Sequence, residues 1–173
     1  MNKTGYSAAS IGIHWITAIA IVALFFTHEG ERDSLTRLFH LSGGALLGIF
    51  LIWRVVRRFR MGLSAKPDQA EILNLLSRLV LWGLLAVILV TCLSGYLLPW
   101  TGGRAFDFFG MSIPSPIAGN HTLHEIFEEV HDIGGHLFIP LIALHVAGVI
   151  KHALFDSDKS VAKRMSKSIS NGI

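Results

Sequence analysis

The sequence predicts an all-α membrane protein, a transmembrane four-helix bundle with up-down topology. Three observations carry this prediction. Of the 173 residues, 51% are hydrophobic, and the mean hydropathy of +0.54 exceeds that of ordinary soluble domains. Four apolar runs approach or exceed the roughly 20 residues with which a helix crosses a bilayer. The Lys and Arg residues are distributed unequally between the two ends of these runs.

The apolar runs are Ile11–Phe26, Leu38–Val56, Ile72–Leu98 and Val130–Leu154. Each is expected to be helical, because the bilayer core holds no water to satisfy backbone N–H and C=O groups. The first is expected to be a retained helix, since no persuasive signal-cleavage site follows it. The third is long, so we expect it to tilt or to end in the membrane interface at Pro99 and Trp100.

The connection between the third and fourth runs, residues 99–129, is the longest and contains three prolines. Such a loop is expected to lie over the membrane surface. We therefore assign residues 1–10 to an N-terminal segment, 11–155 to the four-helix domain and 156–173 to a basic tail.

The basic residues predict the orientation of the bundle. Twelve of the fifteen Lys and Arg fall on one side and three on the other. The twelve are Lys3, Arg54, Arg57, Arg58, Arg60, Lys66, Arg78, Lys151, Lys159, Lys163, Arg164 and Lys167, and the three are Arg32, Arg37 and Arg104. The positive-inside rule then places both termini and the loop between the second and third runs in the cytoplasm. Because these charges flank apolar runs, the expected partner is membrane lipid and not nucleic acid.

Four histidines fall within the apolar runs at two depths. His14 and His145 lie toward the inner side, and His40 and His131 toward the outer side. His131 and His145 share one helix face, because fourteen residues rise about 21 Å over nearly four turns. Two histidines per layer, from different helices, match the two axial ligands of a six-coordinate haem. Zinc would need its ligands to converge at one depth. A lone intramembrane histidine is often a packing or proton-relay residue, so a metal or proton transporter is an alternative.

Glycines follow three of these histidines at helical spacing. They lie three or four residues after His40, His131 and His145, on the face of the histidine itself. They are Gly43, Gly44, Gly134, Gly135 and Gly148. We expect them to leave space for a flat macrocycle, although glycine also packs helices in membranes. After His14 the corresponding residues are Thr17 and Ala18.

The other histidines receive different predictions. His28, His121 and His124 are expected to be solvated in loops or at the interface. His136 lies about 140° around the helix from His131, so it is expected to pack or to meet a neighbouring helix. His152 lies at the inner rim, where it is either an interfacial residue or a proton-carrying group beside the inner layer. The single cysteine, Cys92, is expected to be a packing residue, and no CxxCH motif for covalent haem attachment is present.

The sequence resembles the bacterial cytochrome b561 family over nearly its whole length. The motifs that carry the resemblance are "IHW", "FHLSGG", "GYLLPW" with "FFGMSIP", and "VHD" followed fourteen residues later by "LHVAG" and then "KH". The resemblance implies two b-type haems. His14 and His145 would ligate the inner haem, and His40 and His131 the outer one. This is the pairing that the depths of the histidines indicate.

Within this family the pattern is similar to that of superoxide oxidases, which pass electrons from superoxide outside the membrane to ubiquinone. The resemblance implies a quinone near His152, Tyr6, Ser7 and Ser10. The outer loops are net acidic, which also suits a cationic donor such as a soluble c-type cytochrome. An alternative function is a cytochrome b relay subunit docked to a larger dehydrogenase or hydrogenase.

Overall fold

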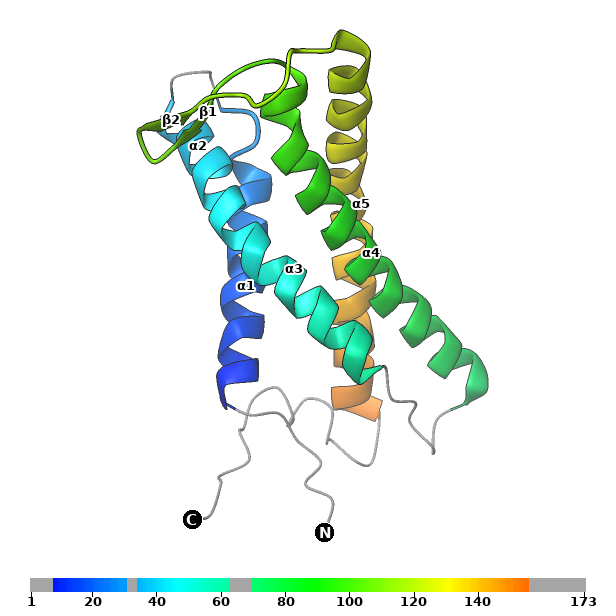
Figure 1. Cartoon of the computed structure of the whole chain (residues 1–173). Helices are drawn as coiled ribbons and strands as arrows, with labels where there is room; N and C mark the ends of the chain where they lie inside the picture. Colours follow the sequence, from blue (N-terminus) through cyan, green and yellow to red (C-terminus); the bar gives the residue numbers. More distant parts are fainter. Residues whose placement is uncertain (1–7, 31–33, 63–69, 156–173) are drawn as a thin grey trace.

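The computed structural model describes residues 8–30, 34–62 and 70–155, and within them it is almost entirely helical (Figure 1). Four helices are long and apolar enough to cross a membrane. This confirms the prediction of an all-α bundle with four spans. The helical elements are α1 (Ala8–Phe26), α2 (Leu35–Leu38), η1 (Phe39–Gly43), α3 (Gly44–Met61), α4 (Glu71–Thr101) and α5 (His121–Phe155).

The second span consists of α2, η1 and α3, which continue one another. Ser34 caps its start, and its side chain accepts a hydrogen bond from the backbone N–H of Arg37 at 3.2 Å. Element η1 is a π-helical turn that contains His40. A single π turn inside an α-helix is frequent at functional sites, because it rotates one side chain relative to the helix on either side.

Helix α5 begins nine residues before the predicted Val130. Asn120 precedes it, and its Oδ1 accepts a hydrogen bond from the backbone N–H of Leu123 at 3.0 Å. The added turns carry Glu125, Glu128 and Glu129 and extend beyond the other helices (Figure 1). The apolar run did not predict these turns because their side chains are polar. The N-cap asparagine is a start signal that indicates them.

A two-stranded hairpin covers the N-terminal end of the second span. Strands β1 (Phe106–Phe108) and β2 (Met111–Ile113) pair antiparallel, and Phe109 and Gly110 between them have positive φ angles of 47° and 86°. Two such residues form the type of tight turn that matches strand twist. The fully buried Ser42 anchors the hairpin, because its Oγ accepts from the N–H of Phe109 at 2.9 Å and donates to the carbonyl of Asp107 at 3.2 Å.

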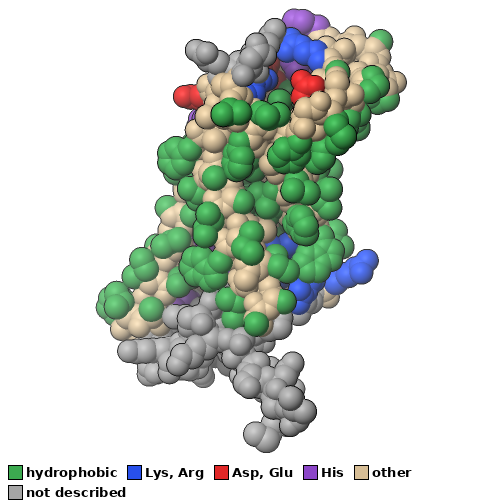
Figure 2. All heavy atoms as spheres, turned by 90° about the vertical axis from the view of Figure 1, so that its left-hand side faces the viewer, with side chains coloured by type: hydrophobic (Ala, Val, Ile, Leu, Met, Phe, Trp, Pro, Cys, Tyr) green, Lys and Arg blue, Asp and Glu red, His purple; other side chains and the backbone are tan. Residues whose placement is uncertain are grey.

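The helices pack in a pattern that separates the histidine-bearing elements. Helix α4 packs closely along α5 and also contacts α3, and α3 contacts α1. Neither α1 nor α3 packs closely along α5 within the part of the chain that the structure describes. In these same ranges the buried hydrophobic side chains are Leu51, Val55 and Phe138. Many large apolar side chains are exposed instead, and Figure 2 shows apolar side chains covering the middle of one face, with charged residues toward its ends.

The described helix ends fall into two groups. Helix α1 begins, α3 ends, α4 begins and α5 ends at one end of the bundle, while the hairpin lies at the other (Figure 1). This is the up-down arrangement that the sequence predicts. The basic tail, residues 156–173, lies outside the described residues.

Candidate functional site: two layers of paired histidines

The structure brings the two predicted inner histidines together. His14 on α1 and His145 on α5 have ring centroids 6.4 Å apart, with an angle of 68° between the ring planes. Both rings are partly buried. Because α1 and α5 do not pack closely against each other, the two imidazoles bridge the space between these helices.

The predicted outer histidines form a second pair. His40 in η1 and His131 in α5 have ring centroids 6.1 Å apart, with the planes at 87°. This pair also joins helices that do not pack closely, here the second span and α5. The two pairs lie in separate layers, because His131 and His145 are fourteen residues apart along one helix.

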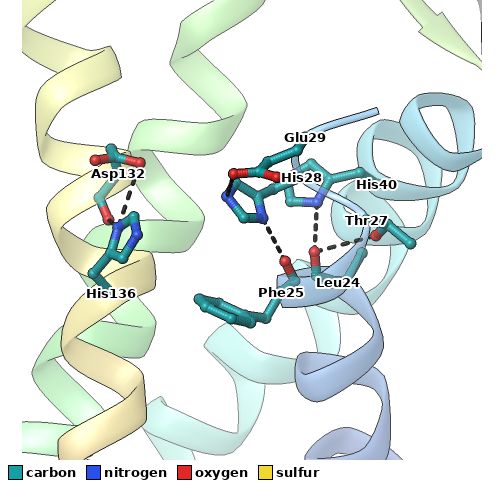
Figure 3. A network of polar contacts seen from close by, with 8 residues as sticks. All are labelled: Leu24, Phe25, Thr27, His28, Glu29, His40, Asp132 and His136. Carbon is teal, nitrogen blue, oxygen red and sulfur yellow. Dashed lines mark hydrogen bonds and ion pairs between the residues drawn. The ribbon is translucent and has the colours of Figure 1, made fainter. Parts of the chain in front are cut away.

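Backbone carbonyl groups hold both rings of the outer pair. Nδ1 of His40 lies 2.9 Å from the carbonyl oxygen of Leu24, and Nδ1 of His131 lies 3.0 Å from that of Thr91. A carbonyl oxygen only accepts hydrogen bonds, so each Nδ1 donates its proton and each Nε2 presents a lone pair. Metal-ligating histidines are commonly oriented in this way. Figure 3 shows the contact between His40 and Leu24.

Helix α4 carries no histidine, but it supplies several of the groups that contact His131. Besides the Thr91 carbonyl, the buried Ser94 places its Oγ 3.3 Å from Nδ1 of His131. At Gly95 an added Cβ would lie 2.8 Å from Cε1 of the same ring, so only glycine fits at this position. Sequence reasoning gave α4 no part in the site. The adjacent serine and glycine within an apolar run are the signal that indicates a close approach.

A cation lies beside the inner pair. Nη1 of Arg54 on α3 donates to Oγ1 of Thr17 at 2.6 Å, and its Nη2 contacts Nδ1 of His14. Thr17 is buried on α1, three residues after His14. Sequence reasoning counted Arg54 only toward topology. Its position, two residues inside the predicted end of an apolar run, is the signal that sets it apart.

The predicted macrocycle glycines have different surroundings. A Cβ at Gly135 or Gly148 would meet nothing within 4 Å, and at Gly43 or Gly44 it would make only ordinary contacts near 3.9 Å. At Gly134 a Cβ would lie 2.2 Å from Oγ1 of Thr91, so the close packing of α5 on α4 already explains this glycine. A role for all five in packing a macrocycle remains a prediction.

Two observations test whether these residues fit a haem. In a bis-imidazole complex each nitrogen lies about 2 Å from the metal, which places the ring centroids roughly 6 Å apart. The observed separations of 6.4 Å and 6.1 Å agree with this requirement. A flat ring next to His131 or His145 needs a position without a side chain on the same face of α5. The open space at Gly135 and Gly148 meets this need. The outer pair therefore fits the group in both spacing and tautomer. The inner pair fits in spacing, but Nδ1 of His14 faces the donors of Arg54, so in this arrangement its Nε2 carries the proton.

Two further histidines lie near the outer pair. The rings of His28 and His136 have centroids 6.2 Å apart, and Phe25 contacts both. The prediction that His136 meets a neighbouring helix is confirmed. His28 lies in the turn after α1, as predicted, but it is only partly solvated, because its side chain is 35% exposed and its Nδ1 contacts the carbonyl of Phe25 (Figure 3). Local sequence does not show that the end of α1 turns this ring toward α5.

The first turns of α5 change two other predictions. His124 is partly buried against the end of α4, with Nδ1 3.1 Å from the carbonyl of Leu98, so it is not a solvated loop residue. His121 is helical and exposed, 3.3 Å from Glu125. The difference follows from the early start of α5, which brings His124 over α4.

The predicted quinone residues are only partly described. His152 lies partly buried near the inner end of α5. The Oγ of Ser10 accepts a hydrogen bond from Nη2 of Arg57 at 3.2 Å. Tyr6 and Ser7 lie outside the described residues.

Comparisons with known proteins agree with this geometry. A sequence model of the prokaryotic cytochrome b561 family matches residues 5–167. The chain belongs to the prokaryotic cytochrome b561 family. This cytochrome b561 is therefore a multi-pass membrane electron-transfer protein, and membership implies b-type haem. It is similar to the "Probable superoxide oxidase CybB" of Yersinia pestis, with 18% identity over 169 residues that cover 94% of this chain and 96% of the relative.

Proposed function

We propose that this protein is a dihaem b-type cytochrome that carries electrons across the bacterial inner membrane, from a donor on the periplasmic side to ubiquinone. The observation that carries the proposal is the presence of two imidazole pairs in separate layers, each with the spacing that a bis-histidine metal requires. His40 and His131 would ligate the outer haem, and His14 and His145 the inner one. With both termini in the cytoplasm, the hairpin faces the periplasm.

The side chains have separable roles in this function. When bound, a bis-histidine haem supplies a one-electron couple with no open coordination site. The carbonyls of Leu24 and Thr91 fix the outer rings with Nε2 toward the metal. Ser94 and Gly95 hold α4 against His131. The protein thus provides ligation, burial and positioning, while the redox chemistry belongs to the cofactor.

Superoxide is the proposed donor, and the relative named as a probable superoxide oxidase supports it. On the acceptor side, His152 at the inner end of α5 is positioned to deliver protons to a quinone reduced there. Ser7 and Ser10 are proposed to bind the quinone with it. This makes the protein a superoxide:ubiquinone oxidoreductase.

The test is a stopped-flow experiment with the oxidised, purified holoprotein. A pulse of superoxide should produce reduced haem bands rapidly, and added ubiquinone should discharge them. Haem bands that respond to quinol but not to superoxide would contradict superoxide as the donor. Absence of haem bands would contradict the dihaem cytochrome itself.

A second candidate donor is a soluble cationic c-type cytochrome, or a larger dehydrogenase or hydrogenase that this chain serves as a relay subunit. The first turns of α5 favour this candidate. They extend past the other helices and expose Glu125, Glu128 and Glu129 on the side of the hairpin (Figure 1). An exposed acidic surface attracts a cationic partner and repels superoxide, which is an anion.

A further inference from the structure

His28 and His136 form a third pair of neighbouring imidazoles, which the proposed function does not use. His28 lies in the turn after α1, and His136 lies on α5. Their ring centroids are 6.2 Å apart, close to the 6.1 Å of the outer pair, and their planes meet at 88°. Figure 3 shows both rings in the space between the end of α1 and α5. Two helices that do not pack closely are therefore joined here by a further pair of histidines.

Backbone carbonyl groups fix the tautomer of both rings. Nδ1 of His28 contacts the carbonyl oxygen of Phe25, and Nδ1 of His136 lies 3.0 Å from that of Asp132. A carbonyl oxygen only accepts hydrogen bonds, so in each neutral ring Nδ1 carries the proton and Nε2 keeps a lone pair. Neutral histidines that bind metal ions are commonly oriented in this way. His14 differs, because its Nδ1 faces the donors of Arg54.

Two carboxylates lie beside this pair. Nε2 of His28 is 3.8 Å from Oε1 of Glu29, and Nδ1 of His136 is 3.5 Å from Oδ1 of Asp132. A separation of 3.8 Å is too long for a hydrogen bond. Two atoms that bind one metal ion at about 2 Å each can, however, lie up to roughly 4 Å apart. Two negative charges next to two neutral nitrogen donors favour a divalent cation.

Exposure makes this pair suited to a small ion and not to a haem. The side chains of His28 and His136 are 35% and 61% exposed. A haem is a large apolar ring that gains stability from burial, whereas a metal ion can keep water molecules as ligands. Both rings lie toward the hairpin end of the bundle, where an ion can reach them from water (Figure 1).

We propose that His28 and His136 bind a divalent metal ion that prefers nitrogen ligands, such as Zn²⁺, at the hairpin end of the bundle. Imidazole suits Zn²⁺ and Cu²⁺, whereas Mg²⁺ and Ca²⁺ prefer oxygen ligands. Within residues 8–30, 34–62 and 70–155, no three or more His, Cys, Asp or Glu side chains are placed together to hold a metal ion. The two imidazoles are therefore the protein ligands, and water completes the coordination.

Binding requires a small movement of the two rings. Two imidazoles on one tetrahedral ion have centroids roughly 5 Å apart, so the rings of His28 and His136 approach each other by about 1 Å. Their partial exposure leaves room for this movement. The ion then links the turn after α1 to α5.

Calorimetric titration of the purified holoprotein with ZnCl₂ tests the proposal, with a purification tag that contains no histidine. His28→Ala and His136→Ala should each weaken zinc binding at least tenfold, since even the loss of a partner behind a ligand costs about 10–100-fold. The double variant should bind no more weakly than the weaker single variant, because either change already breaks the site. The control His121→Ala changes an exposed histidine beside Glu125 and should leave the affinity unchanged.

The haem-to-protein ratio of each variant shows whether its fold is intact, and this ratio should not change. Should an alanine variant lose haem, His28→Gln or His136→Gln replaces it, with the same expected loss of zinc binding. Cu²⁺ bound in place of Zn²⁺ should show hyperfine coupling to imidazole nitrogen by electron paramagnetic resonance. A copper spectrum without nitrogen coupling would contradict ligation by these histidines.

Three results would overturn the proposal. They are a wild-type protein that does not bind Zn²⁺, zinc affinity that is unchanged in His28→Ala or His136→Ala, and zinc binding that is lost in His121→Ala instead. Zinc binding is measured separately from the haem spectrum. Absence of haem bands would therefore contradict the dihaem function, and absence of zinc binding would contradict this site.

Discussion

At the scale of single residues, burial separates the proposed ligand histidines from others near them that make the same kind of Nδ1 contact. His131 and His136 lie five residues apart on α5, and both contact a backbone carbonyl through Nδ1. The partly buried ring of His131 faces the ring of His40 in η1, whereas the side chain of His136 is 61% exposed. The ring of His136 also faces another histidine, His28, so burial is the feature that sets the proposed ligand apart.

This difference gives a matched pair of variants. His131→Ala should reduce the haem content from two per chain to one, because the outer haem would lose one of the two histidines proposed to hold it. His136→Ala should leave it at two. Measurement of the haem-to-protein ratio as the pyridine haemochrome checks this. Equal haem loss in both variants would contradict the assignment of His131.

The neighbouring Gly134 and Gly135 provide a second pair. Gly134→Ala should destabilise the protein by about 1–3 kcal/mol, because the new Cβ overlaps Oγ1 of the β-branched Thr91. Gly135→Leu should leave thermal stability of the haem-free protein nearly unchanged but weaken haem retention, since the side chain fills open space.

Thermal unfolding in detergent and haem titration separate these two effects. Thr91→Ala combined with Gly134→Ala should restore stability, since the overlapping atom is removed. If Gly135→Leu binds haem like wild type, the open space at Gly135 does not serve a macrocycle.

At the scale of elements, the hairpin depends on one buried hydroxyl. Ser42→Ala removes both hydrogen bonds of the buried hydroxyl, at a cost of about 0.5–1.5 kcal/mol for each. We expect faster proteolysis or amide exchange between residues 102 and 113. Ser112→Ala, at an exposed position on β2, is the control. Unchanged exchange in Ser42→Ala would show that other contacts hold the hairpin.

The outer end of α5 is the element that distinguishes the two candidate donors. Replacement of Glu125, Glu128 and Glu129 by Gln removes three negative charges from its exposed surface. Reduction by a cationic c-type cytochrome should slow at least tenfold at low salt and lose much of its salt dependence. Reduction by superoxide should stay constant or become faster. Stopped-flow rates at several ionic strengths measure both, and an unchanged rate with the cytochrome would contradict docking at this surface.

At the scale of the whole molecule, orientation decides which layer meets the periplasm. In a Cys92→Ser background, Ser112→Cys on the hairpin should react with a membrane-impermeant maleimide in intact cells whose outer membrane is permeable to it. Arg60→Cys, near the opposite end of the bundle, should react only after the inner membrane is opened. The reverse pattern would contradict the positive-inside assignment.

Some features were predictable because they depend on one helix at a time. The fourteen-residue spacing of His131 and His145 predicts one face and two depths, since rise and turn per residue are fixed by the backbone. The start of α5 lies nine residues before the predicted one, because that prediction rests on apolar residues, whereas His121–Glu129 is mostly polar and still helical. The N-cap at Asn120 is the local signal for it.

The sequence by itself therefore determined four spans, their up-down order and the two layers of paired histidines. Only the tertiary structure decided which groups surround each pair: the carbonyls of Leu24 and Thr91, the close approach of Gly95, and the guanidinium of Arg54 beside His14. The physical reason is that helical periodicity fixes which face of one helix a residue occupies. The rotation of each helix against its neighbours depends on packing between segments far apart in the chain.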